Sequence, residues 1–123
     1  MIKEVGEAMP ARLVALLIIL GHALTAPANA LETVKVADNI YALVGELGQR
    51  SPGNLGNNAT FGVVVTPAGV VLIDAGATAN GAALVEAEIA RIADKRVVAV
   101  VNSGGQDHRW LGNSHWKAKG ARL

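Results

Sequence analysis

The sequence predicts an α+β domain built on a mixed β-sheet. Two observations support this prediction. Two pairs of short apolar segments are each joined by a turn sequence, which is typical of antiparallel hairpins, and an amphipathic helical segment is followed by one more apolar strand. A strand, a helix and a second strand in this order favour a right-handed crossover, and therefore a parallel pairing beside the antiparallel ones. With 123 residues, the chain has room for one domain at most.

The first thirty residues have the pattern of an export leader. Arg12 precedes the short apolar core Leu13–Leu20, and Ala28-Asn29-Ala30 supplies the small-x-small pattern of a cleavage site. A membrane anchor is the alternative, but the apolar run is shorter than the roughly 18–20 residues that a span requires. We therefore expect a signal peptide over 1–30, a mature chain of 31–123 with no stable membrane span, and a periplasmic or secreted location.

Composition excludes several classes of protein. Hydrophobic residues make up 51% of the chain, which argues against disorder, and cysteine is absent, which excludes disulfides and thiolate metal sites. The net charge is only +1, and basic residues are not interleaved with aromatic ones, so nucleic-acid binding is not expected.

The first predicted hairpin is followed by a long loop. Thr33–Val36 and Ile40–Val44 read as strands joined by the turn-forming pair Asp38-Asn39. Gly45–Asn58 is rich in Gly, Asn, Ser and Pro, and Arg50 is its only cation. Loops of this length are often functional, although composition alone fits a surface connection equally well.

The second hairpin joins Ala59–Val65 to Val70–Ile73 through Thr66–Gly69, where the proline and glycine positions fit a type I turn. Both strands are dense in valine and hardly alternate, so we expect both faces of the sheet to be covered. Asp74-Ala75-Gly76 ends the second strand abruptly.

A helix is predicted over Gly81–Ala93, with Thr78 or Asn80 as the residue that caps its start. Apolar residues recur on one face at helical spacing. They are Val85, Ile89, Ile92 and Ala93. The last predicted strand, Val97–Val101, follows the helix and completes the crossover.

The segment Asn102-Ser-Gly-Gly-Gln-Asp-His-Arg-Trp-Leu-Gly-Asn113 places Asp107 and His108 side by side just after this last strand. A carboxylate beside an imidazole is a common beginning of a metal site, while the alternative is an ordinary turn. His115 lies seven residues after His108, where packing or solvent exposure is favoured over ligation.

The segment Gly62–Gly76 ends a strand with Leu-Ile-Asp-Ala-Gly, and the segment Val98–Asn113 contains Asp-His followed by Gly-Asn. Together they resemble the first half of the metallo-β-lactamase superfamily. The wording Gly-Gly-Gln-Asp-His-Arg-Trp-Leu-Gly-Asn is most similar to the quinoprotein relay system zinc metallohydrolases. The resemblance covers roughly 34–123. It implies the N-terminal half of an αββα domain, with 31–123 as a truncated unit. It also implies zinc-dependent hydrolysis of an ester, thioester or amide-like bond in a small-molecule substrate, and association with a periplasmic quinoprotein system.

The same resemblance implies roles for individual residues. Asp107 would be a zinc ligand that also orients the attacking water, and His108 would be a second ligand. Asp74 would lie below the metal loop and orient its groups rather than bind metal; the alternative is a simple turn residue.

Three further residues are candidates for lining a pocket. Arg109 and Trp110 fit an anionic or planar ligand, and Asn113 belongs to the same motif. The competing interpretation of the first two is structural, with a buried Trp110 beside a solvated Arg109.

The sequence also departs from the superfamily pattern His-x-His-x-Asp-His, because Ser103 and Gly105 occupy the first two histidine positions. A single zinc site is therefore expected, and it is incomplete in this chain, which we expect to have little activity alone. The alternative is a non-catalytic periplasmic binding or accessory protein with a decayed metal site.

Overall fold

The computed structural model describes residues 31–123, and the leader predicted for residues 1–30 lies outside them. The described part holds five strands and three helices. In chain order these are β1 (Glu32–Ala37), β2 (Ile40–Val44), β3 (Thr60–Thr66), β4 (Gly69–Ile73), α2 (Ala79–Ile92), β5 (Val97–Val101), α3 (Asp107–Trp110) and α4 (Asn113–Ala118).

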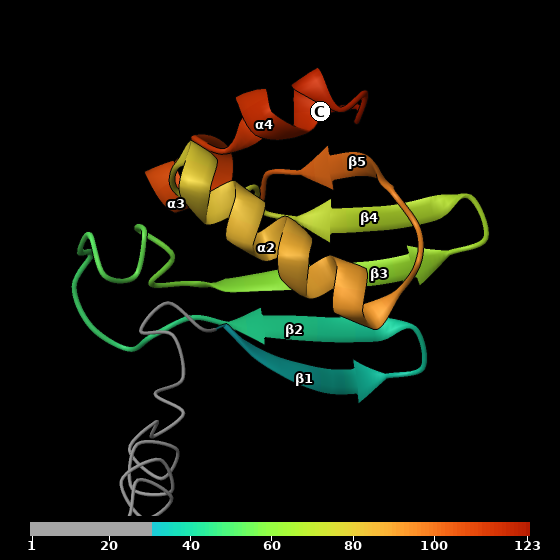
Figure 1. The fold of residues 1–123 in the computed structure, drawn as a ribbon, viewed down its shortest axis with the longest axis horizontal. Coiled ribbons are helices and arrows are strands. Elements are labelled where there is room, and N and C mark those ends of the chain that lie inside the picture. The colour runs from blue at the N-terminus through green and yellow to red at the C-terminus, as the bar shows by residue number, and fades with distance from the viewer. Residues whose placement is uncertain (1–30) are drawn as a thin grey trace, which may run out of the picture.

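The five strands form one mixed sheet in the order β1-β2-β3-β4-β5. The first four pair antiparallel, as the two hairpins predicted, and β5 pairs parallel to β4 after the helical crossover. The parallel pairing is therefore confirmed. Because β4 and β5 run the same way, their carboxyl ends meet at one edge of the sheet, together with loop 45–58 and α3 (Figure 1).

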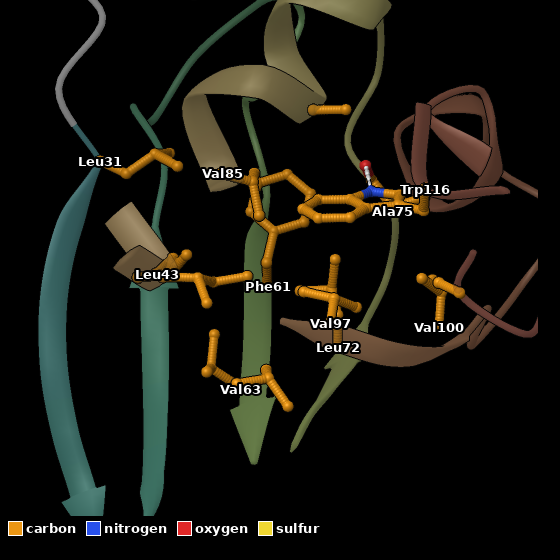
Figure 2. Close-up of a cluster of buried hydrophobic side chains, with 14 residues drawn as sticks. Leu31, Leu43, Phe61, Val63, Leu72, Ala75, Val85, Val97, Val100 and Trp116 are labelled. Carbon is orange, nitrogen blue, oxygen red and sulfur yellow. Dashed lines mark hydrogen bonds between the residues drawn. The ribbon is translucent and has the colours of Figure 1, made fainter. Parts of the chain in front are cut away.

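The hydrophobic core lies between the sheet and the helices, with α2 crossing one face (Figure 1). Phe61, Leu72 and Val85 are fully buried there, and the indole of Trp116 packs among them from α4 (Figure 2). Burial of a large aromatic side chain stabilises a fold by several kcal/mol, so Trp116 contributes strongly to the attachment of α4 to the domain.

The face of the sheet that lies away from the helices is less buried than the valine-rich strands predict. Along β3 and β4 the side chains alternate between fully buried and half-buried, and Val64, Val71 and Ile73 belong to the half-buried set. The prediction that both faces are covered is therefore met only in part within residues 31–123, as expected where a second covering layer is not among the described elements. The valine-rich sequence hides the alternation because both faces carry apolar side chains, and hydropathy cannot distinguish them.

The start of α2 depends on Thr78, which is the capping residue of the two that the sequence offered. Its Oγ1 accepts a hydrogen bond from the backbone N of Gly81 at 2.8 Å and donates one to the carbonyl of Leu55 at 2.9 Å. The cap thus ties the helix to loop 45–58. No helix within residues 31–123 has the length and apolar character needed to cross a bilayer.

Candidate metal-binding site

The loop that follows β5 is fixed to the end of β4 by backbone hydrogen bonds. The N–H of Asp74 donates to the carbonyl of Val101 at 2.9 Å, and the N–H of Ala75 donates to the carbonyl of Arg109 at 3.0 Å. The segment that contains Asp107 and His108 therefore lies directly against the strand that ends in Asp74.

Asp74 holds this loop in place through side-chain hydrogen bonds. Its side chain is buried and its backbone has a φ of 68°, which few residues other than glycine adopt. Its carboxylate accepts hydrogen bonds from the N–H of Ser103 at 2.7 Å, from the hydroxyl of Ser103 at 2.8 Å and from Nη1 of Arg109 at 3.0 Å. Asp74 thus holds two residues of the motif, and both of its carboxylate oxygens accept hydrogen bonds from them.

Asp107 and His108 begin the short helix α3. Oδ1 of Asp107 accepts a hydrogen bond from the N–H of His108 at 2.9 Å and lies 3.8 Å from Nδ1 of the imidazole. At the tetrahedral angle, two zinc bonds of about 2.1 Å place their donor atoms roughly 3.4 Å apart, so a shared zinc ion would require these two atoms to move closer by a few tenths of an ångström. Both side chains are partly exposed, the imidazole less than the carboxylate.

A third residue joins the pair from a distant part of the chain. The guanidinium of Arg50, in loop 45–58, donates to Oδ1 of Asp107 and forms an ion pair with it. This hydrogen bond holds the pKa of the Asp107 carboxyl below its usual value and raises the pKa of Arg50. Asp107 is therefore a carboxylate that already has a cationic partner.

The three pocket candidates occupy different environments. Arg109 is tied down, because its guanidinium binds Asp74, the hydroxyl of Ser103 and, at 3.0 Å, the side chain of Gln106. Trp110 is 45% exposed, and its indole N–H donates to a backbone carbonyl at 3.1 Å. The structural interpretation with a buried Trp110 and a solvated Arg109 is wrong, since the buried tryptophan is Trp116.

Asn113 closes the motif through a reciprocal amide pair with Asn102. Each side chain donates its amide N–H to the carbonyl oxygen of the other, at 2.8 and 3.1 Å. Asn102 also donates to the backbone carbonyl of Arg109. The side chain of Asn113 therefore serves to close the loop.

Gly112 and Trp116 fix the segment to the sheet edge in a way that the sequence did not indicate. The N–H of Gly112 donates to the carbonyl of Gly76 at 2.8 Å, and a Cβ on Gly112 would lie 2.2 Å from the carbonyl oxygen of Ala75. The indole N–H of Trp116 donates to the same Ala75 oxygen at 2.9 Å (Figure 2). Only glycine allows this close approach of two backbones.

His115 does not approach the site residues. Its Nε2 lies 2.9 Å from the Glu86 carboxylate, which also binds Lys119 at 2.9 Å. Partial burial raises the pKa of Glu86, but the hydrogen bonds from Lys119 and His115 outweigh it, so the pKa lies below its usual value. The expected packing role fits this position between α2 and α4.

The residues present do not by themselves fit a zinc ion. Asp107 and His108 provide suitable donor atoms, but zinc sites use three or four protein ligands. Within residues 31–123 there is no group of three or more His, Cys, Asp or Glu side chains that could hold a metal ion. At least one further protein donor would have to come from elsewhere.

No family model matches the sequence, and no curated protein is significantly similar to it. Among solved structures, the fold is similar to the crystal structure of a metallo-β-lactamase from Hirschia baltica, with a TM-score of 0.60 and 17% sequence identity. The match covers 74% of this chain and 41% of that one. This chain thus spans less than half of the length of the structure that it resembles. Over the matched residues, it has the fold of part of a metallo-β-lactamase.

Proposed function

We infer that the chain supplies part of a metal-dependent hydrolase of the metallo-β-lactamase fold. Asp107 and His108 would be two ligands of one divalent ion, for which the carboxylate and imidazole donors favour zinc. The observation that carries this proposal is the 3.8 Å separation of Oδ1 and Nδ1 at the edge where β4 and β5 end. The remaining protein donors would come from outside residues 31–123, so this chain alone would have little activity.

The other residues of the motif would support that site without binding the ion. Asp74 would hold Ser103 and Arg109, and through them the loop, in one conformation. The exposed face of Trp110 suits a planar or apolar group of a small-molecule substrate, such as an ester, thioester or amide. A groove of about 480 Å³ beside Arg50, lined mainly by apolar atoms of loop 45–58 and of the start of α2, offers a second surface to such a molecule.

Measurement of bound zinc tests this proposal. A full-length relative that carries the same Asp-His motif would be dialysed against buffered Zn²⁺, and the metal content per chain would be determined for it and for its Asp107→Ala and Asp38→Ala variants, made at the positions that match these two residues. We expect up to one zinc per chain, lost in Asp107→Ala and retained in Asp38→Ala, because Asp38 lies in an exposed hairpin turn. Equal zinc content in all three proteins would contradict the assignment.

A second candidate function is a non-catalytic binding or accessory protein on the same scaffold. The ion pair between Arg50 and Asp107 favours it, because a guanidinium already neutralises the carboxylate. Ser103 and Gly105, which replace two histidines of the superfamily pattern, point the same way. Complete absence of bound zinc in that full-length relative at saturating concentrations would select this candidate.

Export and a periplasmic quinoprotein system as partner complete the proposal. They rest on the leader pattern and on the sequence resemblance, respectively. The mass of the protein recovered from a bacterial host tests the first, since cleavage after Ala30 would leave a chain that begins at Leu31. Co-purification of a quinoprotein dehydrogenase with the exported chain would test the second.

A further inference from the structure

We propose that the face of the sheet that lies away from α2 is a dimer interface, on which a second copy of this chain packs sheet against sheet. This inference goes beyond the proposed function and does not depend on it, because it involves no residue of the loop that carries Asp107 and His108. It rests on the side chains of the five strands, on the charge of the surface that they form and on the area of that surface.

The strand register arranges the side chains of this surface, which we call the outer face, in rows across the sheet. One row crosses all five strands through consecutive pairs, and every member of it is apolar. Its members are Val34, Ala42, Gly62, Ile73 and Val101. Leu43, Phe61 and Leu72, each adjacent in sequence to a member, are fully buried on the side of α2, as the alternation of side chains along a strand requires.

A second apolar row lies beside the first. It crosses four strands and consists of Ile40, Val64, Val71 and Ala99. No side chain of either row belongs to the hydrophobic core or packs against it, and Val34, Ile40 and Val101 are 38%, 41% and 50% exposed within the described chain. Strands that face water on one side normally carry polar residues there, so two apolar rows indicate a surface that is covered in use.

The edges of the sheet are guarded, which leaves the outer face as the surface for association. At β5, the N–H of Val100 donates to the carbonyl of Arg122 at 2.8 Å, and the N–H of Arg122 donates to the carbonyl of Val98 at 3.0 Å. At β1, the register shifts just after Lys35, an exposed cation. A bulge and a lysine on an edge strand both discourage pairing with another strand.

The charge of the outer face favours a second copy over a charged partner. Within residues 31–123, the only charged residue at the paired strand positions of this face is Glu32, which lies on the edge strand β1 in a third row with Val44 and Thr60. A charged partner would find no counter-charge at the centre of the face, whereas a second copy presents the same apolar rows. Such a self-complementary surface is what a dimer with two-fold symmetry requires.

The area of the outer face suits a weak dimer. Strands about 4.8 Å apart give a width of roughly 24 Å, and three rows about 6.8 Å apart give a length of roughly 20 Å. Two copies would therefore bury about 1,000 Å², near the lower limit of specific interfaces, which corresponds to a dissociation constant of roughly 10–100 µM. The apolar run Leu13–Leu20 of the predicted leader would span only about 12 Å as a helix, so it is too short to cover this width.

Sedimentation equilibrium of the chain as recovered from a bacterial host, between about 5 and 500 µM, tests the proposal. The monomer mass measured under denaturing conditions is the reference. Val71→Lys alters the centre of the outer face, Ile40→Lys alters a more exposed position of it, and the control Leu47→Lys adds the same charge to a loop residue that is 97% exposed. The wild type and Leu47→Lys should approach twice the monomer mass at the highest concentration.

The two variants on the outer face should have dissociation constants raised by more than about 10-fold, because two-fold symmetry brings the new lysine into the apolar interface twice. Circular dichroism melting shows whether each variant is folded. If Val71→Lys does not fold, Ile40→Lys decides, because its side chain replaces one that is already 41% exposed.

Four outcomes would overturn the dimer. The first is a wild type that stays monomeric over the whole range. The second is a dimer that folded Val71→Lys and Ile40→Lys leave intact, since the contact would then lie elsewhere. The third is a dimer that Leu47→Lys weakens equally, since net charge would be the cause. The fourth is a mass that grows beyond the dimer, because a two-fold contact closes there. None of them concerns zinc content, so the proposed function stands or fails separately.

Discussion

Replacement of Asp74 by alanine should strongly destabilise the hydrogen-bond network of the loop that follows β5. The carboxylate is buried and accepts three hydrogen bonds, two from Ser103 and one from the guanidinium of Arg109. Asp74→Ala leaves the backbone N–H of Ser103 and the charge of Arg109 without their partner. The loop between β5 and α3 loses its side-chain attachment to the end of β4 at the same time, while the backbone hydrogen bonds of Asp74 and Ala75 remain.

The magnitude can be worked from these contacts. Hydrogen bonds to a charged group contribute about 1.5–3 kcal/mol each, but bonds that share one carboxylate are not additive. Breaking a buried ion pair costs about 3–5 kcal/mol, and the lower end applies because the Arg109 side chain, 31% exposed, can regain water. We therefore expect Asp74→Ala to lower the free energy of unfolding by about 3 kcal/mol, against a total of about 5–14 kcal/mol for a domain of this size.

A second variant separates the lost contacts from the backbone strain. Asp74 has a φ of 68°, so an alanine there adds strain that a glycine does not. Asp74→Gly should therefore be about 1 kcal/mol more stable than Asp74→Ala, although it loses the same hydrogen bonds. Asp38→Ala, at an exposed turn, is the control and should change stability by less than about 1 kcal/mol.

Urea denaturation followed by circular dichroism measures all four proteins. The reasoning fails if Asp74→Ala unfolds within about 1 kcal/mol of the wild type, because the three hydrogen bonds would then contribute nothing in solution. It also fails if Asp74→Gly is less stable than Asp74→Ala, since the positive φ would then not describe the folded chain.

Three further changes test other parts of the structure. Gly112→Ala should unfold the domain or lower the free energy of unfolding by more than about 3 kcal/mol, because its Cβ would lie 2.2 Å from the Ala75 oxygen. The control Gly105→Ala meets no atom within 4 Å and should change the free energy of unfolding by less than about 0.5 kcal/mol. Equal melting temperatures of these two variants would contradict both expectations. Trp116→Phe removes the indole donor to Ala75 and should cost about 1–2 kcal/mol by urea denaturation, and no loss would show that this bond is not formed. Glu86 has a lowered pKa in the folded chain, so it stabilises the fold above its unfolded pKa of 4.5, and this stabilisation is lost as the pH falls through the folded pKa. Glu86→Gln should therefore flatten the dependence of unfolding free energy on pH below pH 4.5. An unchanged dependence would show that the hydrogen bonds from Lys119 and His115 do not lower this pKa.

The order of strands and the crossover could be predicted because each depends on local sequence. Asp38-Asn39 marks the first turn, and Asn39 has the positive φ of 62° that asparagine tolerates. The helix predicted over 81–93 is found at Ala79–Ile92, a shift of the size that helix ends usually show. Which face of the sheet is covered was not predictable, because β3 and β4 carry apolar side chains on both faces.

The candidate site was less accessible to sequence reasoning. The adjacency of Asp107 and His108 is a property of the sequence, but the partner of Asp107 is Arg50, which lies 57 positions earlier. The only indication was that Arg50 is the sole cation of a long loop, and nothing local specifies where such a loop folds back. The two tryptophans illustrate the same limit, since only tertiary contacts determine that Trp116 is buried and Trp110 is not.

The most direct test of the proposed metal site is the response of the histidine ring nitrogens to zinc, followed by ¹⁵N NMR on the full chain. His108 should shift on addition of Zn²⁺ and lose that shift in Asp107→Ala. His115, held 2.9 Å from the Glu86 carboxylate, should stay unchanged and serves as the internal reference. If the ring nitrogens of His108 do not respond, or if only those of His115 do, the Asp107–His108 pair does not bind a metal ion.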